Sequence, residues 1–154
     1  MSVMILALLI GVIAGLRALT APAAISWGAY AGWLPLQGTA LAFLGFPATP
    51  YILTLLALGE LVADQLPQTP SRKAPMGFGA RLVTGGLCGG AIGAAQSVLI
   101  AGLIAGVIGA VIGTLAGYAG RMRLAGAFGR DRPAAFLEDL VAIAGAAAIV
   151  GALA

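Results

Sequence analysis

Long apolar runs, separated by short polar stretches, dominate the pattern of this chain. The runs cover residues 2–20, 49–65, 80–97, 99–120 and 133–153. A helix that crosses the hydrocarbon layer of a membrane needs about 20 apolar residues, and each run is close to that length. We therefore predict an all-α, polytopic transmembrane bundle of about five spans, formed by residues 1–154 as a single domain.

The segment 21–48 differs from these runs because prolines and glycines interrupt it. Its apolar pieces are too short to cross a membrane. Trp27, Tyr30 and Trp33 cluster within it, as aromatic side chains do where a membrane meets water. We expect a re-entrant or interfacial segment here.

Polar positions predict where the helices begin and reverse. Thr49-Pro50 is a typical helix start, and residues 66–75 form a polar loop broken by prolines. One helix over 80–120 would be about 60 Å long, twice the thickness of the hydrocarbon layer. We predict that this run reverses at Gln96-Ser97, the polar pair inside it.

The basic residues predict an orientation. Six of the eight lie in two loops: Arg72 and Lys73 in the first, and four arginines within 121–132 in the second. The positive-inside rule places both loops in the cytoplasm, so an even number of spans must separate them. This puts the N-terminus in the cytoplasm, the segment 21–48 on the outer side and the C-terminus outside. The first apolar run has no basic residue before Arg17, so we expect a retained helix and not a signal peptide.

Composition supports the membrane prediction and excludes several kinds of chemistry. Hydrophobic residues make up 61% and charged residues 8%, against about 25% charge in a soluble domain. The chain has no histidine and one cysteine, Cys88, which excludes an intrachain disulfide and a His- or Cys-rich metal site. No nucleophile–base pattern or nucleotide loop is present, so we predict no enzyme, no cofactor and no metal. The few basic residues face a membrane, which argues against nucleic-acid binding.

Glycines recur every fourth residue in several helices. Gly85, Gly89 and Gly93 form one such series, and Gly109, Gly113 and Gly117 form another. Small residues at this spacing let helix backbones approach closely in lipid. They indicate structural packing within one subunit or between subunits, which makes a homo-oligomer plausible; the alternative is a glycine-lined pore.

Ionisable residues inside or beside the predicted spans are the candidate site. They are Arg17, Glu60, Asp64, Arg81, Glu138 and Asp139. Such groups are costly in lipid, so they pair with each other or line a functional cavity. All except Arg17 fall toward the cytoplasmic half, where an ion-pair cluster with Arg72, Lys73 or Arg121 is expected. Arg17 stands apart, near the outer end of the first helix.

Two interpretations of this expected ion-pair cluster are possible. In the first it only fixes the register of the helices. In the second it forms a polar cavity for an ion, a proton or an anionic headgroup.

The two halves of the chain resemble each other weakly, as an internal repeat would. Arg17-Ala18-Leu19-Thr20 matches Arg81-Leu82-Val83-Thr84, and the acidic segment 58–63 matches 137–142. Inverted repeats are common in small transporters. The predicted spans make the acidic helices antiparallel but the arginine helices parallel. Either the segment 21–48 crosses the membrane, or the repeat is a chance match in Ala-, Gly- and Leu-rich sequence.

The segment 59–72, followed by Ala-Arg-Leu-Val-Thr-Gly-Gly at 80–86, resembles the signature of the bacterial domain-of-unknown-function family 4126. The segments 15–22, 113–118 and 137–143 fit the same pattern, so the resemblance covers nearly the whole chain. Gln65 departs from it, because lysine is expected there. The resemblance implies a small multi-span protein of a bacterial inner membrane and supplies no activity.

Two functions follow as hypotheses. The first is a small transporter or channel for an ion, a proton or a small anionic solute. In it Glu60 and Glu138 bind the ion or proton, and Arg17 and Arg81 hold an anionic group. The second is a scaffold without transport activity that binds lipid headgroups or partner helices. Its lipid-phosphate contacts would come from Arg72, Lys73 and Arg121, with membrane lipids as the partner.

Overall fold

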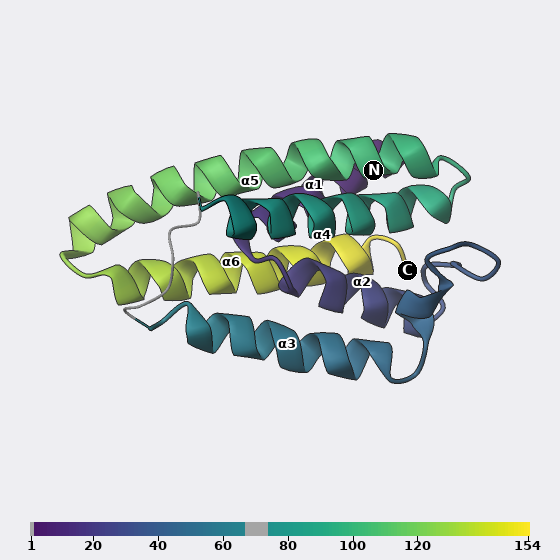
Figure 1. The fold of residues 1–154 in the computed structure, drawn as a ribbon, viewed down its shortest axis with the longest axis horizontal. Helices are drawn as coiled ribbons and strands as arrows, with labels where there is room; N and C mark the ends of the chain where they lie inside the picture. The colour runs from purple at the N-terminus through teal and green to yellow at the C-terminus, as the bar shows by residue number, and fades with distance from the viewer. Residues whose placement is uncertain (1, 67–73) are drawn as a thin grey trace.

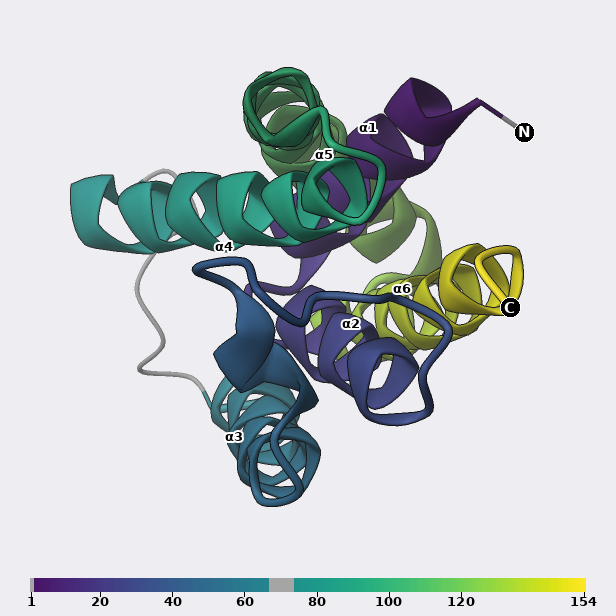
Figure 2. The ribbon, with the colours of Figure 1, turned by 90° about the vertical axis from the view of Figure 1, so that its right-hand side faces the viewer.

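The computed structural model describes residues 2–66 and 74–154, and within them the chain is all helical. The elements are α1 (Val3–Leu16), α2 (Thr20–Tyr30), the 3-10 helix η1 (Ala42–Gly45), α3 (Thr49–Ala63), α4 (Pro75–Ala94), α5 (Leu99–Phe128) and α6 (Asp131–Gly151). The predicted all-α class is confirmed. The helices form an elongated bundle, with α3, α5 and α6 along its long axis and α4 inclined to that axis (Figures 1 and 2).

Local sequence explains several of the helix ends. Ser2 caps α1 by accepting a hydrogen bond from the Ile5 N–H, and Pro75 occupies the first turn of α4. The predicted reversal at Gln96-Ser97 is confirmed, because α4 ends at Ala94 and Ser97 has a φ of 61°. Gly129 ends α5 in the left-handed region, with a φ of 65°, where a glycine meets no steric penalty.

The glycine series bring α1, α4 and α5 into backbone contact. A Cβ added to Gly106 would collide with the backbone of Gly85 and Gly89, and a Cβ added to Gly11 would collide with Gly106. Gly109 approaches Leu8 in the same way. These glycine faces are therefore used within one chain, as one of the two predicted packing modes requires.

The predicted five spans are not confirmed. Among the described residues, α5 and α6 are the helices long and apolar enough to cross a membrane, with mean hydropathies of 2.4 and 1.8. Two further apolar helices, α1 with 14 residues and α3 with 15, are shorter than a full span. The second basic segment also differs from the predicted loop. Arg121 and Arg123 lie within α5, and the chain turns only at Gly129.

The first helix ends earlier than predicted, and this changes the path of the chain. α1 stops at Leu16, and α2 runs back alongside the other helices, so α1 and α2 form a hairpin of two short helices (Figure 1). Both termini lie at the end of the bundle opposite the α5–α6 turn (Figure 1). The prediction that the N-terminus and the basic segment 121–132 lie on the same side is therefore unsupported. That prediction treated residues 2–20 as a full span and residues 21–48 as a segment that does not cross the membrane.

The hairpin also bears on the internal repeat. With α2 returning along the bundle, α1 and α4 run in opposite directions, as an inverted repeat requires (Figure 1). The matched motifs do not occupy equivalent places, however. Arg17 follows the last residue of α1, whereas Arg81 lies in the second turn of α4.

Aromatic residues gather where α2 ends and α3 begins. The ring of Trp27 makes edge contacts with Tyr30 and Tyr51, at centroid distances of 6.0 and 5.0 Å. The Trp27 indole N–H donates a hydrogen bond to Thr54 Oγ1 at 3.0 Å. All three rings are partly exposed. The predicted cluster contained Trp33 in place of Tyr51, and its position at a membrane interface stays a prediction.

Candidate functional site

Arg17 occupies the break between α1 and α2 and is completely buried. Its backbone is extended, with φ −139° and ψ 113°, so the helix cannot continue through it. The sequence analysis placed Arg17 apart from the other charges, and this is wrong. Because α1 ends at Leu16 and the chain reverses, the Arg17 side chain points into the bundle among the acidic residues of α3 and α6.

Two carboxylates from different helices bind the Arg17 guanidinium. Nη1 lies 2.7 Å from Asp64 Oδ2 at the end of α3, and Nη2 forms an ion pair with Asp139 Oδ1 of α6. The side chains of Asp64 and Asp139 are only 10% and 12% exposed. An arginine presents donors on two edges, so one buried guanidinium can bridge two carboxylates.

A second arginine extends this network toward the surface. Arg121 Nη1 of α5 lies 2.5 Å from Asp64 Oδ2. Its Nε and Nη2 donate hydrogen bonds to the two carboxylate oxygens of Asp131, at 2.8 and 2.5 Å. We call Asp139, Arg17, Asp64, Arg121 and Asp131, joined in this order, the charged cluster. It links α6, α1, α3 and α5, and it runs from a fully buried guanidinium to an Asp131 side chain that is 59% exposed.

Glu60 binds the same break through the backbone. Its two carboxylate oxygens accept hydrogen bonds from the N–H groups of Ala18 and Leu19, each at 2.8 Å. Unpaired N–H groups at a helix start carry partial positive charge and need acceptors. Glu60 of α3 therefore supplies, from a separate helix, the cap that the sequence before α2 lacks.

Hydroxyl groups complete the polar surroundings of the break. The Thr114 hydroxyl of α5 lies 2.8 Å from the Ala110 carbonyl and 3.3 Å from the Gly15 carbonyl in the last turn of α1. Thr20, the first residue of α2, is 8% exposed, and its hydroxyl has no hydrogen-bond partner among the described residues. A buried hydroxyl without a protein partner is a place where water or a bound ion is expected.

The other predicted site residues have different positions. Glu138 is half-buried beside Asp139 in α6, and Arg81 is 7% exposed in α4. Arg72 and Lys73 lie outside the described residues. Arg121, predicted to contact lipid phosphate, instead belongs to the charged cluster. Sequence reasoning missed Asp131, although an acid in the first turn of a helix after Gly129 was a usable signal.

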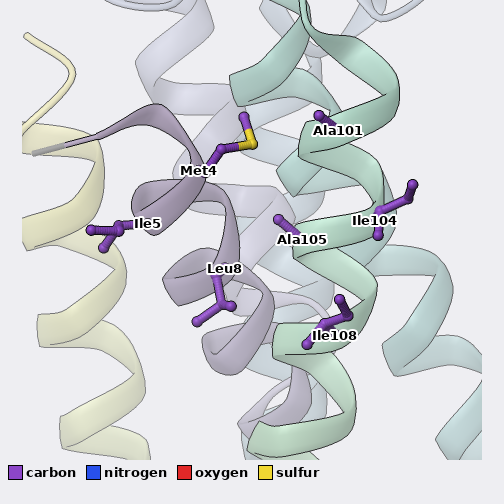
Figure 3. Close-up of a pocket in the computed structure, with 7 residues that line it drawn as sticks. All are labelled: Met4, Ile5, Leu8, Ala101, Ile104, Ala105 and Ile108. Carbon is purple, nitrogen blue, oxygen red and sulfur yellow. The ribbon is translucent and has the colours of Figure 1, made fainter.

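Two apolar grooves lie on the outside of the bundle, away from the charged cluster. The first, of about 440 Å³, runs between α1 and α5 and is lined by residues such as Met4, Leu8 and Ile108 (Figure 3). The second, of about 530 Å³, lies between α4 and α5 and includes Leu41 and Leu103. Their linings carry almost no polar surface, so neither groove offers a binding site for an ion.

The chain was compared with family models, curated proteins and solved structures, and none of them matches it. The class of protein therefore rests on the helical bundle and the charged cluster alone.

Proposed function

We propose that this chain is a small multi-helix membrane protein that passes protons, or small monovalent cations, through the charged cluster. The observation that carries the proposal is the fully buried Arg17, held between Asp64 and Asp139 at the tip of a hairpin of short helices.

Membrane residence is supported by the outer faces of the helices. Large apolar side chains are exposed along α3, α5 and α6, including Leu55 at 69%, Ile100 at 71% and Leu140 at 64%. Only 33% of the most apolar stretch of α5, and 39% of that of α6, is buried inside the bundle. Surfaces of this kind need a lipid environment or a partner. Location in a bacterial inner membrane, and membership of the domain-of-unknown-function family 4126, are proposals from the sequence.

The α1–α2 hairpin supports a transport role over a plain bundle. Non-helical backbone at membrane depth is tolerated where protein surrounds it or where it lines a water-filled cavity. The break at Arg17 is surrounded by α3, α5 and α6 side chains, and Glu60 satisfies its backbone donors. Broken helices with charged groups at the break are the ion sites of many small transporters.

The charge balance favours a proton or cation over an anion. The charged cluster contains three carboxylates and two guanidinium groups, so its formal charge is −1. Both guanidinium groups already bind carboxylates, and an anion would have to displace one of them. A proton or small cation needs only the carboxylates, and Asp139 is the inner end of the network.

Flux measurements on vesicles test this proposal. The purified chain would be reconstituted into vesicles that hold a dye sensitive to pH, potassium or sodium, and a gradient of the matching ion imposed. We expect flux above protein-free vesicles, and at least a tenfold loss in Asp139→Asn. The matched control is Gln96→Ala, an exposed residue of the α4–α5 turn, which should keep the flux of the unmodified chain.

Two outcomes would overturn the proposal. One is a folded Asp139→Asn protein with unchanged flux, and the other is an unmodified chain with no proton, potassium or sodium flux. The second outcome would leave the scaffold hypothesis, in which the charged cluster only holds helices together. Should Asp139→Asn fail to fold, Asp139→Glu keeps the test open, because it retains the carboxylate and should retain measurable flux.

A further inference from the structure

The turn between α5 and α6 carries charged and apolar side chains that the charged cluster does not use. We call residues 122–136 the α5–α6 tip. α5 has 30 residues and is therefore about 45 Å long, some 15 Å more than the hydrocarbon layer. If α5 enters the membrane near Leu99, its last turns leave the hydrocarbon at about Arg121, and the α5–α6 tip lies among the lipid headgroups.

Three arginines of the tip are available to bind a ligand. Arg123, Arg130 and Arg132 are exposed, and none of them has an ion pair or hydrogen bond with a described residue. Arg121, one turn earlier, is different because Asp64 and Asp131 bind it. Asp131 is engaged by Arg121, so it does not neutralise the three free guanidinium groups.

Exposed apolar side chains are interleaved with these arginines. Met122 is 60% exposed, Phe128 50% and Phe136 64%. A surface that is basic and apolar together fits the boundary between phosphates and acyl chains better than it fits water or nucleic acid. The aromatic group of Trp27, Tyr30 and Tyr51 lies toward the opposite end of the bundle, at the α2–α3 connection (Figure 1).

We infer that the α5–α6 tip binds the headgroups of anionic phospholipids. Arg123, Arg130 and Arg132 contact the phosphates, and Phe128 and Phe136 enter the adjoining acyl layer. The positive charge of the three guanidinium groups favours an anionic headgroup over a zwitterionic one, and each guanidinium can also bind two phosphate oxygens. The inference rests on membrane residence and is independent of ion flux.

Lipid retention measured by native mass spectrometry tests the inference. The full chain would be released from nanodiscs that hold equal amounts of phosphatidylglycerol and phosphatidylcholine. We expect phosphatidylglycerol to be retained in about a hundredfold excess, because each of the three arginines contributes a factor of about five. The triple variant Arg123→Gln, Arg130→Gln, Arg132→Gln should show no preference. The matched triple lysine variant should keep most of it, because lysine retains the charge.

Two controls separate the contribution of the arginines from that of the apolar side chains and of free phosphate. Phe128→Ser with Phe136→Ser should lower the retention of both lipids and leave their ratio unchanged, since these rings contact acyl chains. Inorganic phosphate at the concentration of the lipid should not displace phosphatidylglycerol. The inference is overturned if the folded triple glutamine variant keeps the preference, or if free phosphate abolishes it.

Discussion

The bundle holds its helices together in two different ways, and α1 takes part in both. Along its length, Gly11 and Gly15 press directly on the backbone of α5. At its end, Arg17 forms ion pairs with α3 and α6. In the proposed lipid environment, apolar burial gives little drive for helix association, so close backbone packing and polar contacts would have to supply it. We call the glycines at the close backbone contacts of α1, α4 and α5 the glycine layer; they are Gly11, Gly15, Gly85, Gly89, Gly106 and Gly109. The stability of the glycine layer depends on how closely the backbones fit, whereas that of the charged cluster depends on the pairing of opposite charges.

The largest expected effect comes from filling the glycine layer. Gly106→Leu places a side chain against the backbones of Gly85 and Gly89, neither of which has a flexible side chain that can move away. Overpacking of this kind costs about 3 kcal/mol or more. We expect little folded protein, measured as loss of the monodisperse peak and of the thermal transition in detergent.

The control lies in the same helix. An added Cβ at Gly120 or Gly126 meets nothing within 4 Å, so Gly126→Leu should leave the thermal transition nearly unchanged. If Gly106→Leu folded as well as Gly126→Leu, the glycine layer would not be the tight contact described here.

Neutralising Arg17 is expected to have the next largest effect. Arg17→Met keeps much of the volume but leaves Asp64 and Asp139 buried without their shared partner. Removing one partner of a buried ion pair costs about 3–5 kcal/mol. The double variant Arg17→Met, Asp139→Asn should recover part of that loss in thermal unfolding. If Asp139→Asn changed the stability by the same amount in the unmodified chain and in the Arg17→Met variant, the two side chains would not interact.

The difference between the two regions also explains what could be predicted from sequence. Four-residue glycine spacing is a local pattern, so the close packing of Gly85 and Gly89 could be predicted directly from the sequence. The clustering of Asp64 with Asp139 also followed, because the basic segments placed both near one end. The role of Arg17 could not be predicted, because it depends on α1 ending at Leu16 and on α2 turning back. No proline or glycine marks that break between Leu16 and Thr20.

Glu60 offers a smaller test, at the edge of the charged cluster. Glu60→Gln keeps one acceptor oxygen but turns an amide N–H₂ toward the N–H of Ala18 or Leu19. Loss of one such cap costs about 1–2 kcal/mol. We expect a lower unfolding temperature, and faster hydrogen exchange at Ala18 to Ala21 in particular. Exchange that rises equally in α5 would mean that Glu60 does not act at the start of α2.

The smallest effect is expected at the outer end of the cluster. Asp131 binds Arg121 through both oxygens, but its side chain is 59% exposed and water screens the pair. Exposed ion pairs contribute at most about 1 kcal/mol. Asp131→Asn should therefore lower the unfolding temperature by little, and the loss should shrink further in high salt. Asp64→Asn should cost several times more under the same conditions, because Asp64 is buried between Arg17 and Arg121. If Asp64→Asn and Asp131→Asn lowered the unfolding temperature equally, burial would not determine how much each ion pair contributes. The inner and outer ends of the charged cluster would then both behave as exposed ion pairs.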